Sequence, residues 1–190
     1  MGHPSARPYV SYADYFEAES SAEERHEWID GVVYAMSRGT PEHGRLVSAI
    51  NGELRAASKG QCTVYSESTT LYVQDANVST YADVMVVCTP VLTMAVMRNG
   101  KSLGEAITNP AVIVEVLSSP TERYDRQEKF AYYKQLASLE EYVLVSQDLR
   151  RIEVFRRPAD ERGTWACEEG RDGETVSVHG TPISVDAVYA

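Results

Sequence analysis

The stretch VIVEVLSS, from Val112 to Ser119, decides how this sequence folds. It places one carboxylate, Glu115, in the middle of an apolar and mostly β-branched run, which is typical of a strand buried on both faces. An ionised carboxylate in such a strand is costly unless it has a partner. Glu115 is therefore either half of a structural ion pair or a metal-binding or catalytic group, and we favour the second interpretation.

The sequence around this strand predicts a mixed β-sheet flanked by helices, which is an α/β architecture of the mixed α+β type. Helices are expected over residues 11–19, from Pro41 to about Gly60 with Thr40 as N-cap, and from Thr121, as N-cap, to about Ala137. The Asp30-Gly31 pair predicts a hairpin. Further strands are expected at 62–67, 69–73, 83–88, 141–146, 151–157, 164–168 and 175–178. Residues 91–104 are expected to be a mobile loop.

Length and composition predict one domain over residues 1–190, with residues 1–8 as a flexible tail. The formal net charge of −10 counts against a nucleic-acid-binding protein and suits a protein that gathers a divalent cation. No signal sequence and no membrane-spanning apolar run is visible, so a cytoplasmic protein without a membrane partner is expected. The three cysteines, Cys62, Cys88 and Cys167, are interpreted as reduced core thiols because they show no metal-ligand or disulfide spacing.

A second carboxylate, Asp83, opens the apolar run DVMVVC after a short turn at Tyr81-Ala82. On its own, Asp83 is best read as a turn residue at a strand edge. Together with Glu115 on a neighbouring strand, however, it could share a Mg²⁺ or Mn²⁺ ion.

The helix after Glu115 supplies a lysine on its core-facing side. Successive helical residues advance by 100°, which puts Lys129 on one stripe with Tyr133 and Leu136. An inward-facing lysine requires an anionic neighbour, and Glu115 is available. The alternative is an ordinary ion pair between Asp125 and Lys129 at i,i+4 spacing.

Four further residues are candidate supporting groups. His43 lies near the start of its helix on the apolar stripe, where a satisfied core histidine is the more common case. Glu27, beside Trp28 in the first hairpin, is a possible additional metal carboxylate. Asp125 and Tyr132 are candidates for orienting Lys129.

The segments RHEWIDGVVYAMS, PEHGRLVSAINGEL, YADVMVVC and ITNPAVIVEVLSSPTERYDRQEKFAYYKQLASLEEYVLVSQ together resemble the Uma family, which is classed with the restriction endonucleases in the PD-(D/E)XK nuclease superfamily. The resemblance runs from about Tyr9 to the end. It implies a restriction-endonuclease-like core with a mixed four-stranded sheet, here extended by the N-terminal hairpin and the C-terminal strands. It also implies a divalent metal held by Asp83 and Glu115, to which we add the carbonyl of Val116 as a candidate third ligand.

Three positions depart from the superfamily pattern. Leu117 stands where the in-strand lysine is expected, and Lys129 looks like its migrated replacement. Ala82 replaces the proline before the aspartate, and Ser118-Ser119-Pro120-Thr121 replaces a Ser-Pro-Ser-Thr order. Neither of the last two departures removes a charge, so the acid-acid-lysine set survives with Lys129 as its lysine.

Two functions remain open at this stage. The first is a Mg²⁺- or Mn²⁺-dependent endonuclease that cleaves DNA, with Asp83, Glu115 and Lys129 as catalytic residues and a homodimer as its working form. The second is a non-catalytic binding or regulatory module that retains a nuclease-like fold. The formal net charge of −10 favours the second function, the non-catalytic module. Basic residues in two segments, 123–134 and 150–157, could still form a positive rim around an acidic site.

Overall fold

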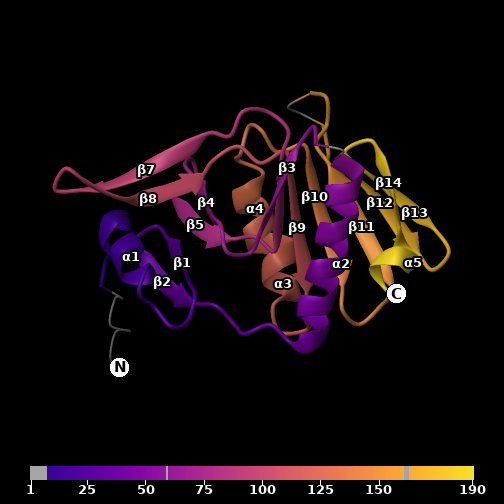
Figure 1. Cartoon of the computed structure of the whole chain (residues 1–190), viewed down its shortest axis with the longest axis horizontal. Helices are drawn as coiled ribbons and strands as arrows, with labels where there is room; N and C mark the ends of the chain where they lie inside the picture. Colours follow the sequence, from indigo (N-terminus) through magenta and orange to yellow (C-terminus); the bar gives the residue numbers. More distant parts are fainter. Residues whose placement is uncertain (1–7, 59, 161–162) are drawn as a thin grey trace.

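The computed structural model describes residues 8–58, 60–160 and 163–190 and shows two mixed β-sheets with a helical segment between them (Figure 1). Apart from Pro8, the expected N-terminal tail lies outside the described residues. The predicted first helix is present as α1 (Tyr12–Glu19), and the Ser11 hydroxyl caps it by accepting a hydrogen bond from the Asp14 amide. Within the described ranges no helix is both long and apolar enough to span a membrane.

The first sheet, called sheet A, is built largely from the N-terminal half of the chain. Its strand order is β2-β1-β5-β4-β8-β7. The strands are β1 (His26–Ile29), β2 (Val32–Ala35), β4 (Thr70–Val73), β5 (Val78–Tyr81), β7 (Thr93–Arg98) and β8 (Lys101–Ile107). Asp30 and Gly31 both have positive φ, 45° and 85°, so the predicted β1–β2 hairpin is confirmed.

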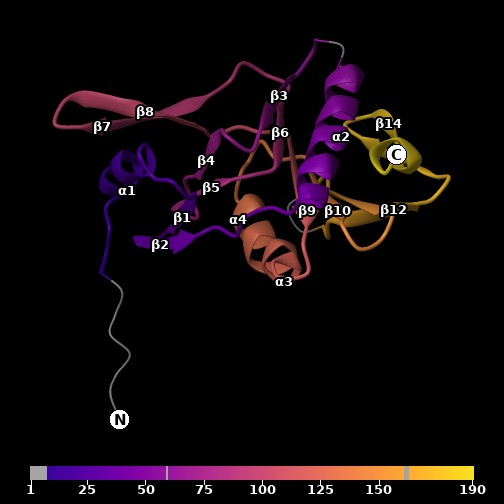
Figure 2. The ribbon, with the colours of Figure 1, turned by 60° about the horizontal axis from the view of Figure 1, so that its bottom comes forward.

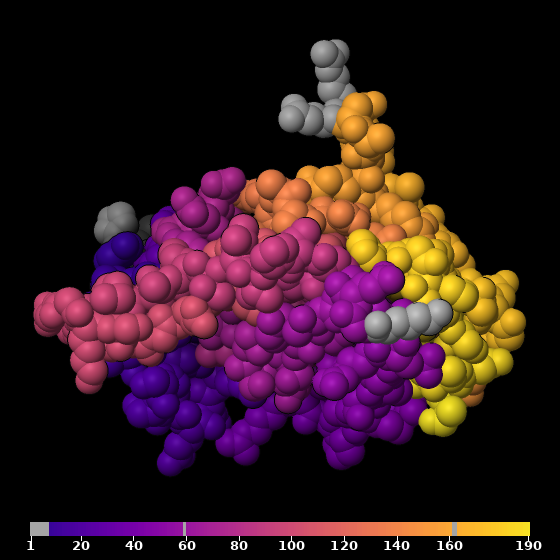
Figure 3. Space-filling view, turned by 45° about the horizontal axis from the view of Figure 1, so that its top comes forward, coloured from indigo at the N-terminus to yellow at the C-terminus, as the bar shows by residue number. Residues whose placement is uncertain are grey.

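The expected mobile loop at residues 91–104 is wrong, because β7 and β8 form a hairpin there. The chain reverses at Asn99 and Gly100, whose φ angles are 50° and 77°. This Asn-Gly pair is a strong hairpin signal that the sequence reading overlooked. The short turn expected at Tyr81-Ala82 lies one residue later, at Ala82-Asp83, because Tyr81 is the last residue of β5 and β6 begins at Val84. The β7–β8 hairpin extends from one end of the molecule (Figure 3).

The second sheet, called sheet B, carries Glu115. Its strand order is β12-β11-β10-β9-β6-β3. The strands are β3 (Thr63–Ser66), β6 (Val84–Val87), β9 (Val112–Leu117), β10 (Glu141–Ser146), β11 (Arg151–Arg156) and β12 (Ala166–Arg171). β9 and β10 are parallel, and the other neighbours in this sheet pair antiparallel. The predicted mixed sheet flanked by helices is therefore confirmed, with more strands than the four of the expected core.

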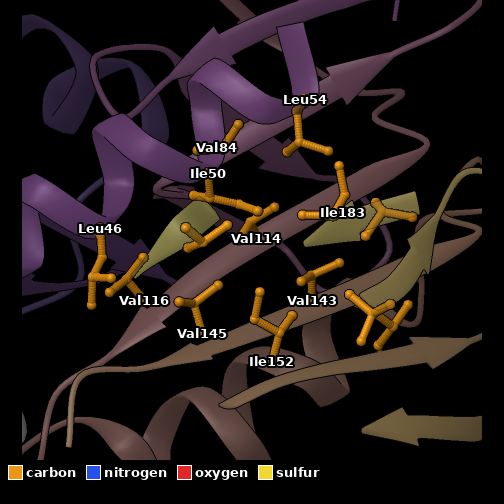
Figure 4. Close-up of a cluster of buried hydrophobic side chains, with 14 of the residues drawn as sticks. Leu46, Ile50, Leu54, Val84, Val114, Val116, Val143, Val145, Ile152 and Ile183 are labelled. Atoms are coloured by element: carbon orange, nitrogen blue, oxygen red, sulfur yellow. The ribbon is translucent and has the colours of Figure 1, made fainter. Parts of the chain in front are cut away.

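The two faces of sheet B are covered by different elements (Figure 2). Helix α2 (Pro41–Ser58), the strand pair β13 (Thr175–Val178) and β14 (Thr181–Ser184), and helix α5 (Val185–Val188) cover one face. Leu46, Ile50 and Leu54 of α2 pack there on valines of β9 and β10 (Figure 4). The opposite face packs on the helical segment after β9, which also contacts sheet A.

That helical segment has three consecutive parts. They are α3 (Glu122–Tyr124), the π-helical turn η1 (Asp125–Lys129) and α4 (Phe130–Tyr133). The helix therefore ends before the predicted Ala137. Thr121 does not cap it with its side chain, and its hydroxyl lies 2.9 Å from that of Ser118 instead.

The interpretation of the cysteines as reduced core thiols is wrong. Cys62 and Cys88 form a disulfide with their Cα atoms 4.1 Å apart, and Cys167 is exposed. Cys62 precedes β3 and Cys88 follows β6, and the pairing of Thr63 with Val87 brings them face to face. The spacing of cysteines along the chain does not reveal this pairing because it depends on which strands are neighbours.

Candidate active site

Glu115 lies in the middle of β9 and points toward the helical segment. Only 3% of the residue is exposed. Its carboxylate Oε1 accepts a hydrogen bond from Lys129 Nζ at 3.1 Å and another from the Tyr133 hydroxyl at 2.7 Å. The buried carboxylate that opened the sequence analysis is thus satisfied by two donors from one helix.

Lys129 points inward, as the helical stripe predicts, and it faces three carboxylates. Besides Glu115, its Nζ lies 3.4 Å from Glu27 Oε1 and 3.7 Å from Asp125 Oδ1. The π-helical turn places Asp125 and Lys129 at its two ends, and the Tyr142 hydroxyl of β10 donates to the Asp125 carbonyl at 3.0 Å. Turns of this kind are frequent at functional sites.

Glu27 brings sheet A into the cluster. It lies on β1, where the hydroxyl of Tyr124 donates to its Oε2 at 2.8 Å and the hydroxyl of Thr80 on β5 donates to its Oε1. Its contact with Lys129 therefore joins sheet A, sheet B and the helical segment at one point. Since each of these side chains is hydrogen-bonded, the cluster is held in a fixed arrangement.

Burial and excess negative charge dominate the electrostatics of this cluster. Burial raises the pKa of Glu115 well above its usual range, and the Lys129 ammonium opposes this shift without cancelling it. Burial likewise raises the pKa of Asp125. For Lys129, burial favours the neutral form, but Glu115, Glu27 and Asp125 raise its pKa well above the usual value. Lys129 is therefore a permanent cation in this site.

Asp83 lies immediately before β6 and next to the Glu115–Val116 peptide. Its Oδ2 accepts a hydrogen bond from the Val116 amide at 2.7 Å, and its Oδ1 lies 3.2 Å from His43 Nε2. The hydrogen bond with Asp83 raises the pKa of His43, and the Val116 backbone adds a smaller effect in the same direction. Asp83, Val116 and the His43 imidazole are consequently in direct contact.

A hollow of about 410 Å³ opens at this point, and Asp83 and His43 contribute to its wall. Glu67 also lines it, and His43, Glu67 and Asp83 offer ligand atoms that lie within 4.8 Å of one another. Glu115 and Lys129 are not part of the wall and lie buried behind it. The site thus has an outer, solvent-facing part and an inner, enclosed part.

The residues present fit a divalent cation. Glu115, Glu27 and Asp125 share the single ammonium of Lys129, and Asp83 contacts the Val116 amide next to Glu115, so carboxylates outnumber cations in this cluster. Carboxylate and carbonyl oxygens are the ligands that Mg²⁺ and Mn²⁺ prefer.

Most residues singled out in the sequence meet at this site. Asp83, Glu115, Lys129, Glu27, Asp125, His43 and Val116 all lie in or next to the cluster. The tyrosine hydroxyls in the cluster belong to Tyr124 and Tyr133 and not to Tyr132. Tyr133 shares the stripe of Lys129 and could have been proposed, whereas Tyr124 depends on the π-helical turn.

Gln147 is a further residue that the sequence analysis missed. Its Nε2 donates to the Leu117 carbonyl at 2.9 Å and lies 3.5 Å from His43 Nδ1, and its Oε1 accepts from the Thr40 hydroxyl at 2.9 Å. It links the start of α2 to the end of β9. No periodic pattern in the sequence marks this role.

The expected positive rim is largely neutralised. Arg126 pairs with Glu122 and Glu153. Arg150 pairs with Asp172 and Asp186. Arg157 donates to the carbonyls of residues 134, 136 and 139 at the end of the helical segment. These side chains stabilise the fold, so their number in the sequence overstates the charge available to a phosphate backbone.

The model of one protein family, Uma2, described as "Putative restriction endonuclease", matches residues 12–187. The chain belongs to the Uma2 family. Two uncharacterized proteins of Synechocystis sp. are similar to it: slr1290, 31% identical across 98% of this chain and 95% of its own length, and sll1609, 28% identical across 84% and 86%. The resemblance to this family inferred from the sequence is confirmed.

The fold of this Uma2 protein is similar to that of a solved structure from Anabaena variabilis, described as a putative nuclease belonging to DUF820. The TM-score is 0.70 at 17% sequence identity, and the similarity covers 93% of this chain and 96% of the other. At this identity the comparison shows a shared fold. It confirms the nuclease-like architecture expected from the sequence.

Proposed function

We propose that this Uma2 protein is a metal-dependent endonuclease that hydrolyses phosphodiester bonds in DNA. The observation that carries the proposal is the convergence of three carboxylates on one buried lysine beside a hollow lined by Asp83 and His43. Family membership supports the same reaction class.

In this proposal Asp83, Glu115 and the Val116 carbonyl hold Mg²⁺ or Mn²⁺. When bound, such an ion polarises a phosphoryl oxygen and lowers the pKa of water. His43 holds Asp83 through its 3.2 Å contact and so fixes the outer ligand. Tyr133 does the same for Glu115 through its hydroxyl.

Lys129 remains protonated and acts as a donor, not as a base. Its ammonium orients the attacking water or stabilises the negative charge that develops on the phosphate. Glu27 and Asp125 hold it from the sides that Glu115 leaves free. A lysine on a helix can therefore replace the in-strand lysine whose position is occupied by Leu117.

Plasmid nicking tests the proposal. Supercoiled plasmid is incubated with the full chain and Mg²⁺, Mn²⁺ or a chelator, and the natural protein is compared with Asp83→Asn, Glu115→Gln and Lys129→Met. We expect metal-dependent nicking that falls by at least about a hundredfold in each variant. Glu128→Gln, an exposed change in the same helical turn, is the matched control and should cleave normally.

Folding of each variant is checked by circular dichroism and thermal unfolding. Nicking that persists in Asp83→Asn or in the chelator would contradict the proposal. Single-stranded DNA and RNA substrates, tested in the same reactions, define the substrate class. We also propose a homodimer, which would allow both strands to be cut, and light scattering of the purified protein tests it.

One observation favours the alternative of a non-catalytic module. The arginines near the site are paired with acidic side chains, which leaves little free positive charge for DNA. In that case the natural protein does not cleave, and Glu115→Gln combined with Lys129→Met is at least as stable as the natural chain.

A further inference from the structure

A cluster of metal-ligand side chains lies at the opposite end of sheet B from Asp83 and Glu115. It contains Cys62, Cys88 and His179, whose ligand atoms all lie within 4.8 Å of one another. Cys88 follows β6 whereas Asp83 precedes it, so the two clusters are separated by the length of that strand, roughly 16 Å. The proposed nuclease mechanism uses none of these residues.

Each ligand is held by regular structure. The cysteines flank the paired strands β3 and β6, with their Cα atoms 4.1 Å apart. His179 lies in the tight turn between β13 and β14, where its amide donates to Glu141 Oε2 at 2.7 Å. Its φ angle of 45° is one that Asn or Asp adopts more readily in such a turn. The three ligand residues thus come from three separate elements, β3, β6 and the β13–β14 turn.

The surroundings of His179 are those of a ligand imidazole. Its Nδ1 lies 3.3 Å from Glu140 Oε2, and a carboxylate behind a metal-binding histidine is the usual arrangement because it orients the ring. The ring is partly exposed and borders a hollow of about 490 Å³. A cation can therefore reach the His179 ring from solvent, whereas Cys62 and Cys88 are half-buried next to it.

We propose that reduction converts the Cys62–Cys88 disulfide, together with His179, into a binding site for a thiophilic divalent cation such as Zn²⁺. A dithiol reductant supplies two electrons and two protons and becomes a disulfide itself, and the cysteines become thiols. Both thiol protons pass to solvent when the thiolates bind the cation. Two thiolates and a neutral imidazole then balance the charge of the ion, and a fourth position stays open.

The distances suit this change. Ligand atoms in a tetrahedral zinc site with ordinary bond lengths lie roughly 3.5–3.8 Å apart. The ligand atoms of the three groups lie within 4.8 Å of one another, which is close to the spacing that such a site needs. The site has two exclusive states: the oxidised state is a disulfide that binds no cation, and the reduced state links β3, β6 and the β13–β14 turn through the metal.

Cobalt binding tests the proposal with the full chain. Protein reduced anaerobically with a phosphine, which does not compete as a thiol, is titrated with Co²⁺, and thiolate-to-cobalt charge-transfer absorption in the near ultraviolet is recorded. We expect one Co²⁺ per chain with this absorption, displaced by Zn²⁺. Oxidised protein should show none. The readout excludes the carboxylate site, because oxygen ligands do not give that absorption.

Variants assign the ligands. His179→Ala keeps both cysteines and should weaken Co²⁺ binding by more than about tenfold, since even loss of a supporting partner costs this much. Cys88→Ser should abolish the charge-transfer absorption, and Cys167→Ser is the control that should leave it unchanged. Absence of the absorption in the reduced natural protein, or unchanged affinity in His179→Ala, would overturn the proposal.

Discussion

The two faces of β9 differ in what they bury. Val112, Val114 and Val116 point toward α2 into a cluster built from apolar side chains. On the other face, Ile113 and Leu117 flank Glu115, which meets Lys129. One strand thus carries ordinary hydrophobic stabilisation on one side and a buried ionic cluster on the other. Burial of the apolar face stabilises the fold, and this stabilisation offsets the desolvation cost of the buried ionic cluster.

Breaking the ionic face should have the largest effect. Lys129→Ala leaves Glu115, Glu27 and Asp125 buried without their cation, and we expect it to lower the free energy of unfolding by about 3–5 kcal/mol. Urea unfolding measures the change.

A double variant that removes both charges of the Lys129–Glu115 pair separates the effect of charge from the effect of packing. Lys129→Met combined with Glu115→Leu removes both charges while keeping similar volume, and it should be more stable than Lys129→Ala by a measurable margin. If the double variant is no better than Lys129→Ala, loss of packing and not the uncompensated charge explains the destabilisation.

Substitutions on the apolar face of β9 should lower the stability of the fold without changing the nicking activity. Ile50 is fully buried against β9, so Ile50→Ala should cost about 2–5 kcal/mol in urea unfolding. Nicking per folded molecule, measured well below the unfolding temperature, should stay at the natural level. A large loss of activity there would show that the two faces are not independent.

Tyr133→Phe removes one hydrogen bond to Glu115 and leaves the ring in place. Because the acceptor is charged, we expect a loss of about 1.5–3 kcal/mol. Urea unfolding of Tyr132→Phe provides the comparison, since Tyr132 lies on the neighbouring position and should change little. Equal losses in both variants would contradict the assigned contact.

The smallest effect is expected at Glu128, which is exposed beside Lys129. Glu128→Gln should change the free energy of unfolding by less than about 0.5 kcal/mol. Thermal unfolding monitored by circular dichroism is sufficient to check it. A larger effect would mean that charge, and not burial, sets the sensitivity of this helix.

The parts of the site that follow from local pattern were predictable from the sequence. Burial of VIVEVL makes Glu115 conspicuous, and helical spacing turns Lys129 toward it. The parts that depend on tertiary placement were not: the contact between Tyr124 and Glu27 joins residues 97 positions apart, one on α3 and the other on sheet A. The Cys62–Cys88 disulfide likewise could be predicted only from the fact that β3 and β6 are neighbours in sheet B.

The fold shows the same division. Hairpins and capped helices follow from turn chemistry, as Asp30-Gly31 and Ser11 illustrate. The split into two sheets does not, because nothing in a strand's own residues states which sheet it joins. The existence of sheet A as a separate sheet was therefore not predictable from the sequence. The contact of Glu27 with Lys129 depends on that sheet and was not predictable either.

The π-helical turn at Asp125–Lys129 also bears on how this site can change over evolutionary time. Such a turn holds one residue more than an α-helical turn, so deleting one residue there would restore an α-helix and rotate everything after it by roughly 100° relative to α3. Tyr124 and Lys129 could then no longer both reach Glu27. Relatives that keep the same cluster must keep the same chain length between β9 and α4, so this segment tolerates substitutions far better than insertions or deletions.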